Sequence, residues 1–261
     1  MEFGLSEDQR LLRESIGGTL EKTAPLERVR KAAERRENYA RDIWDALADL
    51  GVAGMLVPEE FGGMGLGLLD AALAAEMLGR HVVPVPFIAT AVMAPIAIAG
   101  AGSKAQQAAW LPKLASGKAI AGVAVAERAS GARDGAGVSA AGGKLTGTAL
   151  FALDAAAADV IIVADKAGGL HLVTAKAPGL TTVRLTSIDL TRTLTELRFD
   201  NVEAEALASG DAAATLARVI DAGRVMLAAD TLGAGWMMID KAVAYAGERK
   251  QFGRVIGSFQ A

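Results

Sequence analysis

Apolar residues recur at helical spacing through the first hundred or so residues. Ser6-Glu7-Asp8-Gln9 has the form of a capping box, and Leu12, Ile16 and Leu20 follow it on one face. A second apolar stripe leads up to Gly51, a residue type that commonly ends a helix. We therefore predict four helices, a charged connector or solvated helix at 27–41 and an irregular Gly/Pro-rich loop. The helices are expected after Ser6, around Ile43 to Leu50, from Leu69 to Leu78 and from Ser103 to Leu111-Pro112, and the loop at Val57 to Gly65.

The pattern changes to short β-type runs between Ala119 and Phe199. Gly, Asp and Pro separate these runs, as is typical of a compact antiparallel sheet, and Gly142-Gly143-Lys144 has the form of a hairpin turn. The predicted strands are 123–125, 160–164, 170–173 and 194–199.

Helical spacing returns after Val202, with a short segment at 211–221 and a long apolar helix from about Leu216 to Tyr245. The fold class is therefore α+β and multi-domain. We expect an N-terminal all-α domain at 1–117, a middle antiparallel β-domain at 118–204 and the first part of a C-terminal helical bundle at 205–261. The sequence stops soon after the long helix, so this bundle is expected to be incomplete.

The amino-acid composition argues against several classes of function. The chain has 261 residues, 52% of them hydrophobic, and a net charge of −3, so no basic field for nucleic acid is expected. There is no Cys and only two His, His81 and His171, which argues against a disulfide, a thiolate nucleophile and a metal site. No secretory signal is recognisable at the start, which favours the cytoplasm. Residues 82–102 carry no charge, but three prolines favour a buried loop and a short core helix over a membrane span.

Three segments together carry a family resemblance. They read VPEEFGGMG at Val57 to Gly65, LPKLASG at Leu111 to Gly117 and RKQFG at Arg249 to Gly253. Their order and separation resemble the signatures of the acyl-CoA dehydrogenase family, as does the α-β-α plan, and the resemblance covers the whole chain.

The resemblance implies a flavoprotein oxidoreductase of lipid metabolism and β-oxidation. Members of the family use FAD to remove two hydrogens from an acyl-CoA: a carboxylate takes the α-proton, and the β-hydrogen leaves as hydride to flavin N5. The implied partners are the acyl-CoA substrate, an electron acceptor such as a flavoprotein, and further subunits of a homo- or hetero-oligomeric dimer or tetramer that shares FAD sites.

Six residues are expected to contact FAD by this resemblance. Arg249, Gln251 and Phe252 would reach the pyrophosphate and adenosine part of an FAD held mainly by a neighbouring subunit. Without the resemblance, Arg249 and Gln251 would be read as a helix cap, and Phe252 as a packed residue. The flavin ring would meet backbone N–H groups at Ala126 and Ala132 and the ring of Phe151.

The flavin-ring segments depart from the family pattern. Ala126-Glu127-Arg128 stands where Thr-Glu-Pro is usual, and Gly131-Ala132-Arg133 stands where Gly-Ser-Asp is usual, so two hydroxyl donors are missing. Leu153 likewise replaces a Thr. Each lost bond costs only about 1 kcal/mol, so flavin binding is expected to be weakened. An ordinary sheet loop with no flavin against it is the alternative.

No catalytic base is assigned. The usual Glu would lie in a bundle beyond Ala261, and the other family position, immediately before Arg224, is Gly223 here. Asp221 lies about 200° around the helix from position 223. Asp230, in an apolar stretch, could act as a base only if buried, and such residues more often form ion pairs.

Three hypotheses about function follow. The chain is an FAD-dependent acyl-CoA dehydrogenase whose base lies elsewhere, a non-catalytic partner subunit of a hetero-oligomeric dehydrogenase, or a flavin-free scaffold. Asp189-Leu190-Thr191-Arg192 resembles a divergent branch that contains unequal subunit pairs. The acyl group is not predicted, although Gly233, Ala234 and Gly235 suggest room for a large one.

Overall fold

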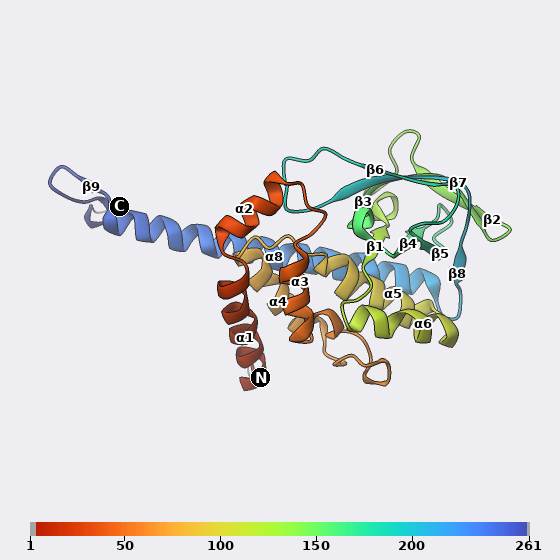
Figure 1. Cartoon of the computed structure of the whole chain (residues 1–261), viewed down its shortest axis with the longest axis horizontal. Helices are drawn as coiled ribbons and strands as arrows, with labels where there is room; N and C mark the ends of the chain where they lie inside the picture. The colour runs from red at the N-terminus through yellow and green to blue at the C-terminus, as the bar shows by residue number, and fades with distance from the viewer. Residues whose placement is uncertain (1–3, 260–261) are drawn as a thin grey trace.

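The computed structural model describes residues 4–259 and has a helical body, a curved sheet and one long helix, arranged as Figure 1 shows. The predicted order of helices, sheet and helix is confirmed. The helical elements before the sheet are α1 (Glu7–Thr23), α2 (Leu26–Glu34), α3 (Arg41–Asp49), η1 (Val52–Gly54), η2 (Glu59–Phe61), α4 (Leu68–Arg80), the π-helix η3 (Ile88–Met93), α5 (Ala94–Ala101) and α6 (Lys104–Ala115).

Local sequence signals explain where α1 begins and where α3 ends. The Ser6 hydroxyl accepts the Gln9 N–H, and the Gln9 side chain accepts the Ser6 N–H, both at 3.1 Å, which confirms the capping box. Gly51 follows α3 in the left-handed region at φ 84°, where a residue with a Cβ would be strained. Trp44 of α3 is fully buried, and its ring N–H donates to the Gly117 carbonyl at 3.1 Å.

The predicted end of α6 at Pro112 is wrong, because the helix continues to Ala115. Pro112 costs the helix one backbone hydrogen bond. Leu111 and Leu114 on either side of it are fully buried, and their burial offsets that cost. Tertiary packing therefore overrides a local helix-breaking signal.

The uncharged stretch 82–102 forms a turn followed by η3 and α5, and nearly all of it is buried in the protein core. Thr90 is its one buried polar side chain: its hydroxyl accepts the Ala121 N–H at 3.0 Å, which joins η3 to the sheet. Within residues 4–259, no helix is both long and apolar enough to cross a membrane.

The sheet pairs its strands in the order β6-β7-β3-β1-β4-β5-β8, with β2 beside β3. All pairs are antiparallel except β1 with β4, which is parallel and therefore departs from the prediction. Gly142 and Gly143, both at positive φ, form the predicted β2–β3 hairpin turn. The strands are β1 (Ala121–Ala124), β2 (Gly137–Ala141), β3 (Lys144–Leu153), β4 (Val160–Ala164), β5 (Leu170–Thr174), β6 (Leu180–Arg184), β7 (Leu194–Glu203) and β8 (Glu205–Leu207).

The two helical segments predicted after the sheet are one helix, α8 (Ala212–Glu248), which Asp211 caps through the Ala214 N–H at 2.9 Å. Its backbone packs directly against the backbone of α4, with no side chains between them at two glycines. A Cβ on Gly79 would stand 1.9 Å from the Asp230 carbonyl oxygen, and one on Gly233 would stand 1.8 Å from the Glu76 carbonyl oxygen. Gly233 therefore serves close helix packing and leaves no room there for an acyl group.

We expect Gly233→Ala to destabilise the protein by about 1–3 kcal/mol, because the added methyl group has to push two helix backbones apart. Gly235→Ala is the matched control: nothing lies within 4 Å of its new Cβ, and Ala favours a helix by about 1 kcal/mol over Gly. Thermal unfolding of the two variants measures the difference. If Gly233→Ala were as stable as the wild type or more stable, the close packing of α4 and α8 would be contradicted.

Candidate cofactor and substrate site

Ala126 and Phe151, two of the expected flavin contacts, lie in one small pocket between helix α7 (Ala126–Ser130) and β3. Glu127 fixes the two elements together, because its carboxylate accepts the Leu150 N–H at 2.6 Å. Ala132 lies in the loop after α7 but is not among the residues that line this pocket. The structure thus brings two of the three ring-contact residues together.

A β-bulge orients Phe151. The pairing of β3 with β7 shifts register between Ala149 and Ala152, and Phe151 takes a positive φ of 56°. Its ring is 37% exposed, and the Arg133 guanidinium lies 5.0 Å from the ring centroid. A strained, partly exposed aromatic residue beside a pocket is a frequent feature of ligand sites.

Helix α8 closes one side of this region through Arg224. Its guanidinium donates to the Ala129 carbonyl of α7 at 2.8 Å and to Asp221 at 3.0 Å. Gly223, the position at which some relatives of this family were expected to carry a base, is buried under Met93. A Cβ on Gly223 would stand 3.0 Å from the Met93 sulfur. A Glu at position 223 would require the flexible Met93 side chain to shift.

The carboxylates considered as a catalytic base either form ion pairs or lie far from the Phe151 pocket. Asp221 is exposed and bound to Arg224. Asp230 is bound to Arg192 of the β6–β7 loop at 2.6 Å, the ion pair that the sequence reading expected to be the commoner role. Glu248 is exposed at the end of α8, far along the helix from Arg224. Residues 4–259 therefore offer no free carboxylate beside Phe151 among these candidates.

Asp154, which lies between the end of β3 and the β6–β7 loop, is a titratable residue that the sequence analysis missed. It follows Phe151 by three residues, adopts φ 52°, and accepts a long 3.5 Å hydrogen bond from the Thr193 hydroxyl. Burial raises the pKa of the Asp154 carboxyl to about 7, although the Arg192 charge and the Thr193 hydroxyl both act to lower it. The sequence gives no sign of this, because only the folded β6–β7 loop covers Asp154.

Two other groups receive no role in this site. Trp236 is 49% exposed on α8. His171 of β5 is bound to Asp165 at 2.8 Å. Among the residues that the structure describes, no group of three or more His, Asp or Glu side chains is placed to hold a metal ion.

The terminal motif forms a tight hairpin at the tip of α8, made of β9 (Lys250–Gln251) and β10 (Arg254–Val255). Phe252 and Gly253 occupy the turn at positive φ. Phe252 is 93% exposed, so the alternative in which it packs does not describe this chain. The Gln251 side chain only donates to the neighbouring Lys250 carbonyl, at 2.8 Å. All three motif residues, Arg249, Gln251 and Phe252, are exposed.

The two halves of the expected FAD site lie far apart in one chain. Arg224 contacts α7 beside the Phe151 pocket, and Arg249 follows it by 25 residues at the end of the same helix. At 1.5 Å per residue this corresponds to about 37 Å. Figure 1 shows the tip of α8 beyond the helical body.

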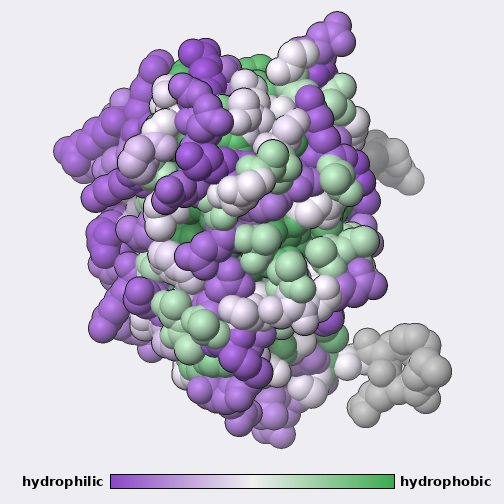
Figure 2. Space-filling model, turned by 90° about the vertical axis from the view of Figure 1, so that its right-hand side faces the viewer, coloured by the Kyte–Doolittle hydropathy of each residue, from purple (hydrophilic) through white to green (hydrophobic). Residues whose placement is uncertain are grey.

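The C-terminal half of α8 exposes several large apolar side chains. These are Leu232 52%, Trp236 49%, Met238 66%, Ile239 53%, Val243 67% and Tyr245 56%. Figure 2 shows the opposite end of the molecule, where hydrophilic side chains occupy most of the rim and apolar ones are scattered between them. Neighbouring large apolar side chains on a surface frequently mark a place where a protein partner binds.

Comparison with known proteins assigns the family. The models "Acyl-CoA dehydrogenase, N-terminal domain" and "Acyl-CoA dehydrogenase, C-terminal domain" match residues 6–118 and 212–261. Acyl-CoA dehydrogenase IpdE2 of Mycolicibacterium smegmatis is 32% identical over 258 residues, which cover 98% of this chain and 70% of the relative. Acyl-CoA dehydrogenase FadE27 of Mycobacterium tuberculosis is 30% identical over 267 residues, with 100% and 70% covered. The chain belongs to the acyl-CoA dehydrogenase family of oxidoreductases.

Solved structures agree in fold. The ChsE4–ChsE5 complex from Mycobacterium tuberculosis contains a chain that aligns with a TM-score of 0.88 and 26% identity, covering 99% of this chain and 72% of that one. A chain of the Tcur3481–Tcur3483 steroid ACAD aligns with a TM-score of 0.84 and 32% identity, covering 97% and 70%.

We expect Asp154→Asn to stabilise the protein more at pH 8 than at pH 5, because only part of the effect has developed at pH 5. The raised pKa means that the folded protein binds a proton which the unfolded chain has lost, so wild-type stability falls as the pH rises from about 4 through 7. A shift of three units corresponds to at most about 4 kcal/mol, and the small exposed part of Asp154 reduces it. Thermal unfolding of both proteins at the two pH values measures the effect.

Asp134→Asn, a change at an exposed residue, is the control and should alter stability equally at both pH values. An equal effect of Asp154→Asn at pH 5 and pH 8 would show that the carboxyl titrates as it does in water.

Proposed function

We propose that this chain is a subunit of an FAD-dependent acyl-CoA dehydrogenase, which removes hydrogens from the α and β carbons of an acyl-CoA thioester. The observation that carries the proposal is the separation of about 37 Å along α8 between Arg224, which contacts α7 beside the Phe151 pocket, and Arg249 of the terminal motif. One FAD is too short to touch both. Each half is then completed by another subunit.

The residues of the pocket are compatible with a flat aromatic ring. Phe151 presents a partly exposed ring face, Ala126 and Gly131 add little bulk, and nothing lies within 4 Å of a Cβ built on Gly131. Arg133, which covers the Phe151 ring, is exposed and can move aside. Phe151 and the backbone at Ala126 and Ala132 would hold the flavin ring. Arg249 and Gln251 of another subunit would bind its diphosphate, with Phe252 beside the adenosine.

FAD, when bound, would supply the hydride acceptor. The chain's own contribution is position and exclusion of water: the Arg224 contact to α7 holds α8 against the pocket, and the Glu127 contact to Leu150 fixes the Phe151 bulge. Asp221 and Asp230, the candidate bases on α8, are engaged in ion pairs, so a base from another subunit would take the α-proton. The reduced flavin would pass its electrons to an acceptor such as an electron-transfer flavoprotein.

The second candidate is a non-catalytic partner subunit of a hetero-oligomeric dehydrogenase. Gly223 favours it, because this chain has no carboxylate at that position and the Met93 side chain occupies the space beside it. The ChsE4–ChsE5 complex and the Tcur3481–Tcur3483 steroid ACAD, which resemble this chain, each combine two named proteins. The exposed apolar surface of α8 would then pack against helices of such a partner.

We expect Arg249→Ala to lower the flavin content of the purified oligomer about tenfold, because a charge-assisted contact to a phosphate is lost. Lys241→Ala is the matched control, since it removes an exposed positive charge from the same helix. Absorbance near 450 nm per polypeptide measures bound flavin. Equal flavin content in the two variants would remove Arg249 from the site.

Subunit mixing tests whether the two halves come from different chains. Arg249→Ala lacks a working terminal motif, and Phe151→Ala lacks a working ring pocket. Co-expression of these two variants should restore flavin that neither binds alone, because a mixed oligomer contains one site built from two intact halves. If each site lay within one chain, the mixture would stay colourless. Restored flavin without acyl-CoA oxidation, until another subunit is added, would favour the non-catalytic partner.

A further inference from the structure

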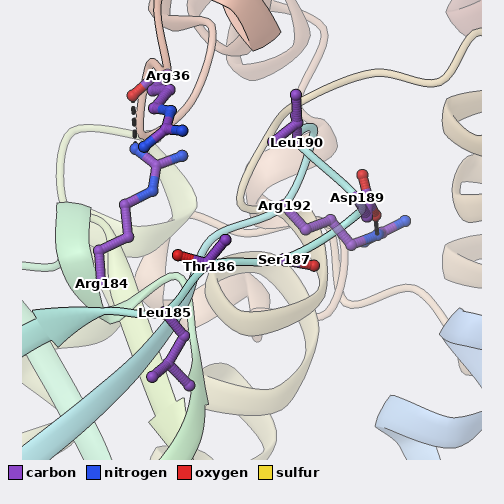
Figure 3. A pocket seen from close by; sticks show the side chains of 8 residues that line it. All are labelled: Arg36, Arg184, Leu185, Thr186, Ser187, Asp189, Leu190 and Arg192. Atoms are coloured by element: carbon purple, nitrogen blue, oxygen red, sulfur yellow. Dashed lines mark hydrogen bonds and ion pairs between the residues drawn. The ribbon is translucent and has the colours of Figure 1, made fainter.

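A pocket outside the Phe151 region lies where the β6–β7 loop approaches the turn between α2 and α3. Figure 3 shows it with Arg36 on one side, Arg184 at the end of β6 and the side chains of the loop around the opening. Arg184 donates to the Arg36 carbonyl at 2.5 Å and to the Asn38 side chain at 3.4 Å. These bonds place two guanidinium groups at the same pocket.

Arg36 occupies this position at a conformational cost. Its φ of 51° lies in the left-handed region, which a long side chain adopts rarely. Residues held in this region tend to occur at binding sites, because the surrounding structure has to stabilise them. The turn thus presents Arg36 to the pocket.

Neither guanidinium has an acidic partner, because the nearby carboxylates are bound to other arginines. Arg28 takes both Glu37, at 2.9 Å, and Asp42, at 2.6 Å. Within residues 4–259, no carboxylate oxygen lies within 4.0 Å of a side-chain nitrogen of Arg36 or Arg184. Two like charges at one pocket repel each other, and a bound anion relieves that repulsion.

The remaining lining residues suit an anion with several oxygens. Thr186 and Ser187 add hydroxyl groups, and neither side chain takes part in a hydrogen bond within the described part of the chain. Asp189 is the one carboxylate in the lining, and Arg192 pairs with it at 3.6 Å. Guanidinium groups match the oxygens of a phosphate through paired N–H donors, so the pocket favours a phosphate ester.

The pocket lies at the same end of the sheet as Phe151. Arg184 of β6 pairs with Thr195 of β7, and Thr195 pairs with Ala152 of β3, the residue after Phe151. Two strand spacings correspond to about 10 Å between Arg184 and the Phe151 segment. An extended ligand with its reactive end beside Phe151 can therefore reach this pocket with a distant phosphate.

We propose that Arg36 and Arg184 form a phosphate-binding site that takes the 3′-phosphate of the CoA carrier. The identification of CoA as the source of the phosphate rests on the proposed function, whereas the phosphate chemistry rests on the pocket alone. The two arginines would therefore recognise the nucleotide end of the thioester and leave the reactive end free to reach the flavin ring that the Phe151 pocket would hold.

Isothermal titration of the purified chain with CoA, dephospho-CoA and inorganic phosphate tests the site. Dephospho-CoA lacks only the 3′-phosphate, and we expect it to bind about tenfold more weakly than CoA. Arg36→Asn, which tolerates positive φ, and Arg184→Gln should each bring the two affinities close together. Arg35→Ala is the matched control, because it removes an exposed charge from the same turn and should keep the difference.

Each result decides one question. Equal binding of CoA and dephospho-CoA to the wild-type chain would overturn the phosphate site and leave the proposed function intact. Binding of inorganic phosphate that depends on Arg184, with no binding of CoA, would overturn the CoA assignment and count against the proposed substrate class. Thermal melting followed by circular dichroism shows whether each variant is still folded. If a variant melts like the wild type but binds CoA and dephospho-CoA equally, the result supports the phosphate site.

Discussion

The contact between α4 and α8 is the constraint on which the rest of the structure depends. Gly79 and Gly233 let the two helix backbones touch, so α8 has one possible direction and rotation along the helical body. That position brings Arg224 to the α7 carbonyl and Asp230 to Arg192 of the β6–β7 loop. The sheet is therefore held to α8 at two points on either side of the Phe151 pocket.

The same straight helix separates the parts of the proposed cofactor site. Because α8 is a single helix, Arg249 is carried away from the pocket that Arg224 closes, and the apolar residues between Leu232 and Tyr245 are left exposed. Under the proposed function, association with further helices or subunits would resolve both consequences. Two half-sites on one chain would then be completed in an assembly, whether its partners are identical or different.

Several elements could be predicted from local sequence. The capping box at Ser6 and the Gly142-Gly143 hairpin act through bonds between near neighbours, so sequence reveals them directly. The strands β2, β6 and β8 were missed, and β3 was recognised only through its hairpin turn. In β2 and β3, Ala and Gly are poor strand signals, and cross-strand pairing decides their state. Pro112 within α6 and the uninterrupted α8 show the same effect in helices, since packing overrides local preference. Of the expected flavin contacts, Ala126 and Phe151 line one pocket, and their contact with flavin stays a prediction, whereas Asp154 was missed because its burial depends on a distant loop.

By itself, the sequence determined the family, the order of helices and sheet, and the absence of a carboxylate at position 223, because each is written in residue identity and spacing. Tertiary structure decided which charged side chains form ion pairs. Arg28 binds the acidic side chains near Arg36, and Arg192 binds Asp230, which is then not free to act as a base. The Met93 side chain occupies the space beside Gly223. Such pairings join residues far apart in the chain, and their energies depend on distance and burial, which no local pattern contains.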